Sequence, residues 1–101
     1  MIQYQIYLGM KTKSLVISSE MIKDFVISHV LNKYSNFTIV EGYGYYKNII
    51  ENVSIITIIS NNNESLKDDD NVKNIALEYK KIYQQDSVLI SKTNLIDYIS
   101  I

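Results

Sequence analysis

The chain has 101 residues, a formal net charge of −1, and 47% hydrophobic and 21% charged residues. This length suits one small domain, and the hydrophobic content excludes a wholly disordered chain. The absence of cysteine excludes disulfides, thiolate metal sites and a cysteine nucleophile. All ten basic residues are lysine and neither half of the chain is strongly basic, so we expect no binding to DNA or RNA.

The sequence also bears on membrane association and assembly. No apolar run approaches the roughly 20 residues that span a bilayer, and Met1–Met10 lacks the basic start of a signal peptide. We therefore expect a cytoplasmic protein without membrane contacts. Because so small a chain buries a small core, we also expect a homo-oligomer, a dimer or larger.

The first part of the chain predicts a strand followed by a helix. Apolar residues alternate with polar ones over residues 2–8, which is the pattern of a half-buried strand. Gly9 then begins a loop, and Ser18 or Ser19 offers an N-cap before Glu20. Apolar residues at three- and four-residue spacing predict a helix at about 19–34: Met21, Ile22, Phe25, Val26, Val30 and Tyr34.

The rest of the chain predicts three strands and a second helix. Strands are expected at 37–46, at 52–60 in a central position, and at 87–91, with a helix at about 71–84. The polar, acidic residues 61–70 are predicted to form a mobile connector. The resulting order is typical of a ferredoxin-like α+β fold, in which a four-stranded antiparallel sheet has both helices on one face. We expect a single domain over residues 1–91 and a docking segment over residues 92–101.

The segment Gly42–Lys47 is the strongest candidate for a binding site, because two glycines alternate with tyrosines and a lysine follows. Such rings stack on bases and the lysine suits a phosphate, whereas the alternative is a bulged strand whose tyrosines serve the core or an interface. His29 lies among apolar helix residues, and the run Asp68–Asp70 precedes a helix, so packing and capping explain them. We expect no metal, no cofactor and no catalytic residue.

Three short motifs resemble a family of small phage and bacterial proteins. They are Ile6–Gly9, Phe37–Lys47 with its Gly-x-Gly-aromatic pattern, and Tyr79–Val88 with its Gln-Asp-Ser-Val ending. The sequence resembles the phage Thoeris anti-defence sponge proteins of the first-described type, over about residues 2–91. The resemblance implies an oligomer that sequesters a cyclic ADP-ribose isomer made by a TIR-domain enzyme, and so inhibits Thoeris immunity without turnover. Cyclic oligonucleotides are a further ligand class of such sponges, but the absence of arginine departs from relatives that use it.

We expect the binding site to form where the Gly42–Lys47 segment, the turn at 84–88 and the Thr93-Asn94 loop meet. Tyr43 or Tyr45 would stack on adenine, in preference to Tyr46, because alternate strand residues share a face. Lysines would face phosphate, and neutral side chains would bind ribose or base. The expected ligand-binding residues are Tyr43, Tyr45, Lys47, Gln85, Ser87, Asn94, Lys11 and Lys13.

Two other function classes remain open on the sequence. The alternative to a sponge is a protein-interaction module or a structural oligomer without a small-molecule ligand, using the open sheet face and the apolar residues after Lys92. An enzyme ranks third, because no nucleophile and base lie at a diagnostic spacing. We therefore expect that the protein is not an enzyme.

Overall fold

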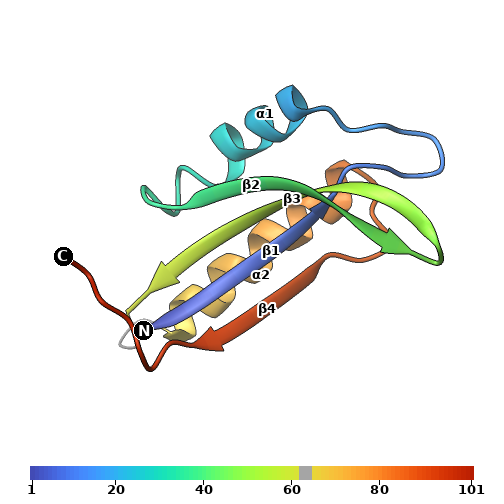
Figure 1. Cartoon of the computed structure of the whole chain (residues 1–101). Helices are drawn as coiled ribbons and strands as arrows, with labels where there is room; N and C mark the ends of the chain where they lie inside the picture. The colour runs from blue at the N-terminus through green and yellow to red at the C-terminus, as the bar shows by residue number, and fades with distance from the viewer. Residues whose placement is uncertain (62–64) are drawn as a thin grey trace.

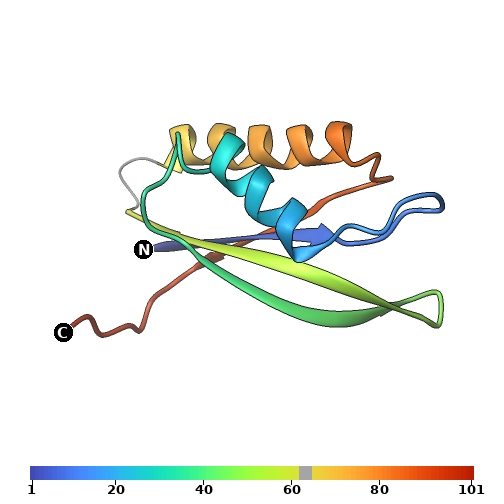
Figure 2. The same cartoon turned by 90° about the horizontal axis from the view of Figure 1, so that it is seen from above.

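The computed structural model describes residues 1–61 and 65–101 and shows six elements in the predicted order. They are β1 (Ile2–Gly9), α1 (Ser19–His29), β2 (Thr38–Tyr46), β3 (Ile49–Ser60), α2 (Ser65–Ile82) and β4 (Leu89–Asn94) (Figure 1). The sheet order is β2-β3-β1-β4, and every neighbouring pair is antiparallel. Both helices cover the same face of the sheet (Figure 2). The ferredoxin-like α+β prediction is confirmed.

The core lies between this sheet and the helices. On β1, Tyr4, Ile6 and Leu8 point to the helix side and are buried, as their period of two predicts. The register places Ile6 opposite Ile56 of β3 and opposite Ile90 of β4, so β1 is paired on both edges. The predicted central position of β3 is confirmed, because it lies between β2 and β1.

Helix α1 begins as predicted but ends earlier. Ser18 is its N-cap and accepts a hydrogen bond from the backbone N–H of Met21. The helix ends at His29, not at about 34, because the N–H of Leu31 bonds the carbonyl of Val26, five residues back. That bond breaks the regular four-residue ladder, and the chain turns toward β2.

The hairpin between β2 and β3 is longer and more regular than predicted. β3 begins at Ile49, three residues before the expected start, because Lys47 and Asn48 form a two-residue turn with φ of 49° and 64°. The pairing runs unbroken through both glycines, so the expected bulge is absent. A side chain at Gly42 or Gly44 would meet nothing within 4 Å, which leaves open space beside the strand.

Helix α2 begins at Ser65, so the prediction that residues 65–70 belong to a connector is wrong. Asp68 lies in the first turn, is 3% exposed, and accepts hydrogen bonds from Tyr34 (2.6 Å) and from Ser60. A buried carboxylate with two hydroxyl donors near a helix N-terminus stabilises the helix start. The rest of the expected mobile connector, residues 62–64, lies outside the described residues.

A second carboxylate joins the same end of α2 to the sheet. Asp69 accepts a 2.5 Å hydrogen bond from the hydroxyl of Tyr4 and lies 3.0 Å from the ammonium of Lys92. The Tyr4 hydrogen bond, followed by that of Lys92, lowers the pKa of Asp69, while burial and Asp69 together raise the pKa of Tyr4. These contacts connect α2 to β1 and β4.

Strand β4 covers Leu89–Asn94, not 87–91, and Thr93-Asn94 is therefore strand and not loop. Pairing with β1 places Asn94 opposite Ile2. Residues 92–94 of the expected docking segment consequently belong to the sheet, and Leu95–Ile101 follow it. The strand is polar at its end because it lies at a sheet edge, where one side of the backbone meets solvent.

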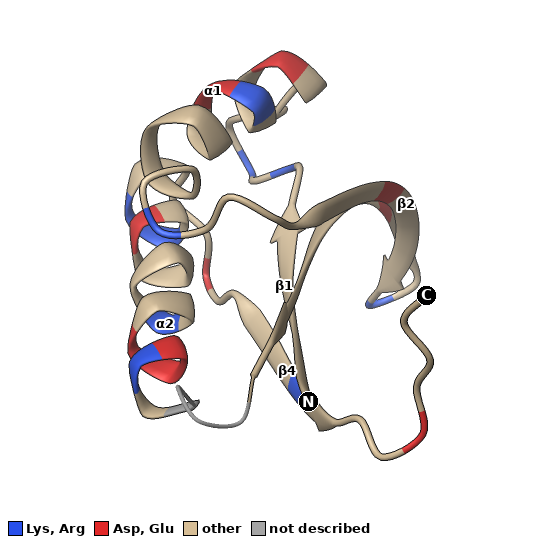
Figure 3. Ribbon diagram, turned by 90° about the vertical axis from the view of Figure 1, so that its left-hand side faces the viewer, with Lys and Arg blue, Asp and Glu red and all other residues tan. Residues whose placement is uncertain are grey.

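The face of the sheet opposite the helices remains open. Charged residues gather mainly on the helices, and the strands have few (Figure 3). The polar row of Tyr7, Gln5 and Thr57 crosses this open face through hydrogen bonds of 3.0 and 3.3 Å. No described helix is both long enough and apolar enough to cross a bilayer.

The buried Asp68 gives a test of this packing. Asp68→Asn should lower the free energy of unfolding by about 1–3 kcal/mol, because Tyr34 and Ser60 would lose their charged acceptor. Asp70→Asn is the matched control, since Asp70 is exposed on the same turn, and should change it by less than about 0.5 kcal/mol. Urea unfolding measures both variants, and equal losses would contradict the assigned role.

Candidate functional site

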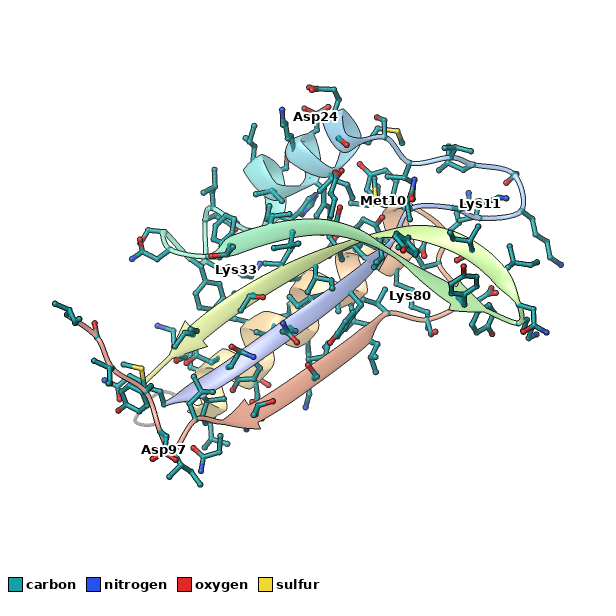
Figure 4. The ribbon with its side chains drawn as sticks, in the orientation of Figure 1. Met10, Lys11, Asp24, Lys33, Lys80 and Asp97 are labelled. Carbon is teal, nitrogen blue, oxygen red and sulfur yellow. The ribbon has the colours of Figure 1, made fainter. Side chains whose placement is uncertain are left out.

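A cavity of about 850 Å³ lies at the end of the sheet where β1 ends. Three segments line it: the tip of the β2–β3 hairpin, the loop after β1, and the segment between α2 and β4. Figure 4 shows Lys11 of the loop near this hairpin tip. The volume is typical of sites that hold a small molecule.

One buried contact brings two of these segments together. Tyr79 of α2 is 0% exposed and donates a 2.6 Å hydrogen bond to the carbonyl of Gly9, the last residue of β1. A Cβ at Gly9 would lie 2.7 Å from Oε1 of Gln85, so a larger residue at this position would displace the end of that side chain. The C-terminal end of α2 therefore lies directly beside the C-terminal end of β1.

The turn after α2 then directs the chain into the cavity. Gln84 has a φ of 52°, which reverses the chain as the helix ends, and the N–H of Gln85 bonds the carbonyl of Lys80. The side-chain amide of Gln85 donates to the carbonyl of Tyr83 at 3.3 Å. Gln84, Gln85, Asp86 and Ser87 all line the cavity.

The loop after β1 is a small ordered hairpin. The backbones of Lys11 and Val16 form an isolated antiparallel β-bridge. The N–H of Thr12 donates to the carbonyl of Leu15 at 2.7 Å, and the N–H of Ile17 donates to the carbonyl of Met10. The cavity is lined by residues 11–14 of this hairpin. Its backbone bonds hold two lysines, Lys11 and Lys13, at the cavity.

Charges of both signs surround the cavity. Lys11, Lys13 and Lys47 provide ammonium groups, while Glu51 and Asp86 provide carboxylates. Glu51 is half-buried on β3 and lies opposite Gly44, the glycine with open space beside it. This arrangement suits a ligand that has both positive and negative groups better than it suits a polyanion.

Exposed tyrosines form the aromatic part of the site. Tyr45 and Tyr46 line the cavity, and each is more than half exposed, so their rings are accessible to a ligand. Tyr43 instead contacts Tyr45 edge-on, with 6.5 Å between ring centroids, and does not line the cavity. The cavity is therefore lined by Tyr45 and Tyr46 and not by the preferred pair of Tyr43 and Tyr45. Beyond the Gly9–Val53 pair, β2 and β3 continue without β1 as a two-stranded hairpin. Two-stranded hairpins twist more strongly than wider sheets, and this twist turns neighbouring side chains of β2 toward the same side.

The structure brings together most, but not all, of the residues expected from the sequence. Lys11, Lys13, Tyr45, Lys47, Gln85 and Ser87 line the cavity, whereas Tyr43 and Asn94 do not. Asn94 pairs with Ile2, at the end of β1 away from Gly9, so it lies apart from the site.

Sequence reasoning missed the parts of the site that depend on spatial pairing. Gly9 and Glu51 line the cavity and were not expected there, and Asp86 lies in the expected turn at 84–88 but was not among the expected ligand-binding residues. Glu51 could have been found from the hairpin register, had the turn been placed at Lys47-Asn48. Outside the cavity, His29 stacks on Phe25 at 4.9 Å between ring centroids, which agrees with a packing role. No group of three or more potential metal-ligating side chains occurs among the residues that the structure describes.

Comparison with known proteins places the sequence in a family. Residues 3–96 match DUF3574, described as a protein of unknown function. The chain belongs to the DUF3574 family. No curated protein matches the sequence. The family match therefore leaves the activity of this DUF3574 chain to be argued from its site.

Two solved structures share the fold of the DUF3574 chain. One is a phage SAM lyase in the apo state, with a TM-score of 0.69 and 19% identity, over 91% of this chain and 78% of that chain. The other is a phage SAM lyase in complex with S-methyl-5'-thioadenosine, with a TM-score of 0.67 and 16% identity, over 91% and 79% of the two chains. At these identities the likeness shows the fold alone.

These neighbours correct one expectation and leave another without support. The expectation that the protein is not an enzyme is contradicted, because the solved structures that share its fold are of a lyase. Neither they nor the family match supports the resemblance to Thoeris sponge proteins in particular. The expectation rested on the spacing of nucleophile and base along the sequence, a criterion that misses sites assembled from distant segments.

The contact between Gly9 and Gln85 can be tested by substitution. Gly9→Ala should lower the free energy of unfolding by about 1 kcal/mol, because the new Cβ displaces Gln85. In the Gln85→Ala background the same change should cost nothing. Gly44→Ala is the matched control and should be neutral or stabilising, since its Cβ meets open space. An equal loss at Gly9 with and without Gln85, measured by urea unfolding, would contradict the contact.

Proposed function

We propose that this DUF3574 chain binds S-adenosylmethionine in the cavity at the end of β1 and cleaves it as a lyase. The observation that carries the proposal is a cavity with accessible tyrosine rings and charges of both signs. The SAM lyase fold supports it, because one neighbour holds S-methyl-5'-thioadenosine, the thioether that remains when the four-carbon amino-acid part leaves S-adenosylmethionine.

The adenosine end of the ligand is assigned to the hairpin tip and the 84–87 segment. The ring of Tyr45 is 74% exposed at the cavity and can stack on adenine. Open space beside Gly44 allows a flat base to approach the strand. Gln85 and Ser87 supply neutral donors and acceptors for the base or the ribose.

The charged end of the ligand is assigned to the mixed charges of the cavity. S-adenosylmethionine has a sulfonium, an ammonium and a carboxylate group. Glu51 and Asp86 match its positive groups, and the lysines of the loop after β1 match its carboxylate. Opposite charges aligned in this way orient the amino-acid part of the ligand.

The proposed reaction breaks the bond between the sulfonium sulfur and the first carbon of the four-carbon amino-acid part. The electron pair of that bond stays on sulfur, which gives the neutral thioether. The four-carbon fragment must then form a new bond at the carbon that sulfur leaves. Either it loses a proton from the neighbouring carbon to a carboxylate such as Glu51 and forms a double bond, or its own carboxylate oxygen bonds to that carbon and closes a ring. No water is added, so the step is a lyase reaction.

A phosphate-containing ligand is the second candidate, because Lys11, Lys13 and Lys47 all line the cavity. Cyclic ADP-ribose isomers, expected from the sequence resemblance, combine adenine with a pyrophosphate and would use the same tyrosine. Cyclic oligonucleotides fit less well, because Glu51 and Asp86 repel a polyanion. A protein that acts only by protein contacts would bind none of these molecules.

Turnover of S-adenosylmethionine tests the proposal directly. The purified chain is incubated with S-adenosylmethionine, and mass spectrometry follows S-methyl-5'-thioadenosine against a heat-inactivated control. We expect product to accumulate in proportion to protein and time, and to form more slowly in Glu51→Gln, which loses a charge that orients the ligand. Formation no faster than in the control would contradict the proposal, and tight binding of a cyclic ADP-ribose isomer instead would favour the second candidate.

Stacking on Tyr45 makes a separate prediction about affinity. Tyr45→Ala should weaken binding of S-methyl-5'-thioadenosine by roughly 5- to 150-fold, since a stacked ring contributes about 1–3 kcal/mol per base. Tyr43→Leu is the control, because Tyr43 has a similarly exposed ring outside the cavity and leucine keeps an apolar contact with Tyr45. Calorimetry measures both, and unchanged affinity in Tyr45→Ala removes this ring from the site.

A further inference from the structure

A second cavity, of about 340 Å³, forms a groove between α2 and β4. Apolar side chains form its floor and two lysines flank it. The lining residues are Lys73, Ala76, Leu77, Lys80, Ser87, Val88 and Ile90. Leu77 is 60% exposed although it lies at the groove, so an apolar surface is left uncovered there.

The segment Leu95–Ile101 has the complementary composition. Its apolar side chains are among the most exposed of the described residues, with Ile96 at 82% and Ile99 at 89%. It has one charged residue, Asp97, and that charge is opposite to the charges of the groove. An extended stretch that exposes several isoleucines is expected to be covered by another surface.

The geometry keeps this segment away from the groove of its own chain. The N–H of Leu95 bonds the carbonyl of Met1 at 2.7 Å, which fixes the start of the segment beside β1. From there the segment leaves the sheet on the face opposite the helices (Figure 2), whereas α2 and its groove lie on the helix face. In Figure 4, Asp97 lies beyond the end of β4 at the lower left, well apart from Lys80.

We propose that Leu95–Ile101 of one copy docks in the α2–β4 groove of a second copy of the same chain. Its isoleucine side chains cover the apolar floor around Leu77 and Val88, and Asp97 pairs with Lys80. Charge complementarity selects this occupant, because the groove has two lysines and the segment has a single acidic residue among apolar ones.

The edge of the sheet favours the same arrangement. β4 is the last strand in the order β2-β3-β1-β4, so its outer edge has no partner strand among the residues that the structure describes. An extended segment lying along β4 pairs with that free backbone while its alternate side chains enter the groove. Backbone pairing and side-chain burial then act together.

This interface would adjoin the ligand site. Ser87 lines both the groove and the larger cavity, so a docked segment contacts the same short connection that walls the ligand site. The docking itself is independent of the proposed lyase activity and can be tested without any ligand.

Crosslinking between labelled copies tests the occupant. Tyr98 is replaced with p-benzoylphenylalanine in ¹⁵N-labelled protein, which is mixed with unlabelled wild type and irradiated. We expect crosslinks from position 98 to α2 or β4 residues of the groove that join a labelled peptide to an unlabelled one. Crosslinks only within one copy, or to surfaces outside the groove, would overturn the proposal.

A charge exchange tests the pairing of Asp97 with Lys80. Asp97→Lys and Lys80→Glu should each weaken self-association by roughly 5- to 30-fold, the range of a moderate interface hot spot, and the double variant should recover it. Lys81→Glu is the matched control, because Lys81 is an exposed lysine on the same helix outside the groove lining. Sedimentation over a concentration series measures association, with circular dichroism confirming the fold. A monomeric wild type at micromolar concentration, or a double variant without recovery, would overturn the proposal.

Discussion

The hydrogen bond from Tyr79 to the carbonyl of Gly9 is the contact on which the candidate site depends. It joins a fully buried hydroxyl near the end of α2 to the last residue of the strand that is paired on both edges. A tyrosine hydroxyl is protonated at neutral pH at its ordinary pKa, and burial raises the pKa of Tyr79 further, so it is a donor here. Through this contact the turn at Gln84-Gln85 and the loop after β1 meet at one end of the sheet, and the hairpin tip completes the cavity.

The opposite end of the molecule is fixed by a different set of polar contacts. Asp68 and Asp69 hold the start of α2 to Tyr34, Ser60, Tyr4 and Lys92. Both ends of α2 are therefore joined to the sheet by polar contacts, and the helix lies beside β4. The groove along the helix and the cavity at its end share Ser87, so the surface proposed for assembly and the surface proposed for the ligand are neighbours.

The fold was predictable from the spacing of buried residues, because residues that share one buried face must recur with the period of the strand or helix. Tyr4, Ile6 and Leu8 show this on β1, and Ile22, Phe25 and Val26 show it on α1. Element ends were less predictable. A turn of Lys47-Asn48 lacks the glycine that usually marks a tight hairpin, and the acidic start of α2 depends on tertiary hydroxyl donors. Of the residues that line the cavity, the sequence pointed to Tyr45 and Gln85, and it missed Glu51, whose place follows from strand register. The binding roles of these residues stay predictions.

The proposed function requires that the cavity at the end of β1 binds an adenosine thioether. Titration of the ¹⁵N-labelled chain with S-methyl-5'-thioadenosine, followed by amide NMR shifts, measures this binding. We expect saturable shifts at Gly9, Gly44, Glu51 and Gln85, which line the cavity, and none at Asn94, which pairs with Ile2 at the other end of β1. An absence of shifts at millimolar ligand, or shifts centred on another surface, would contradict it.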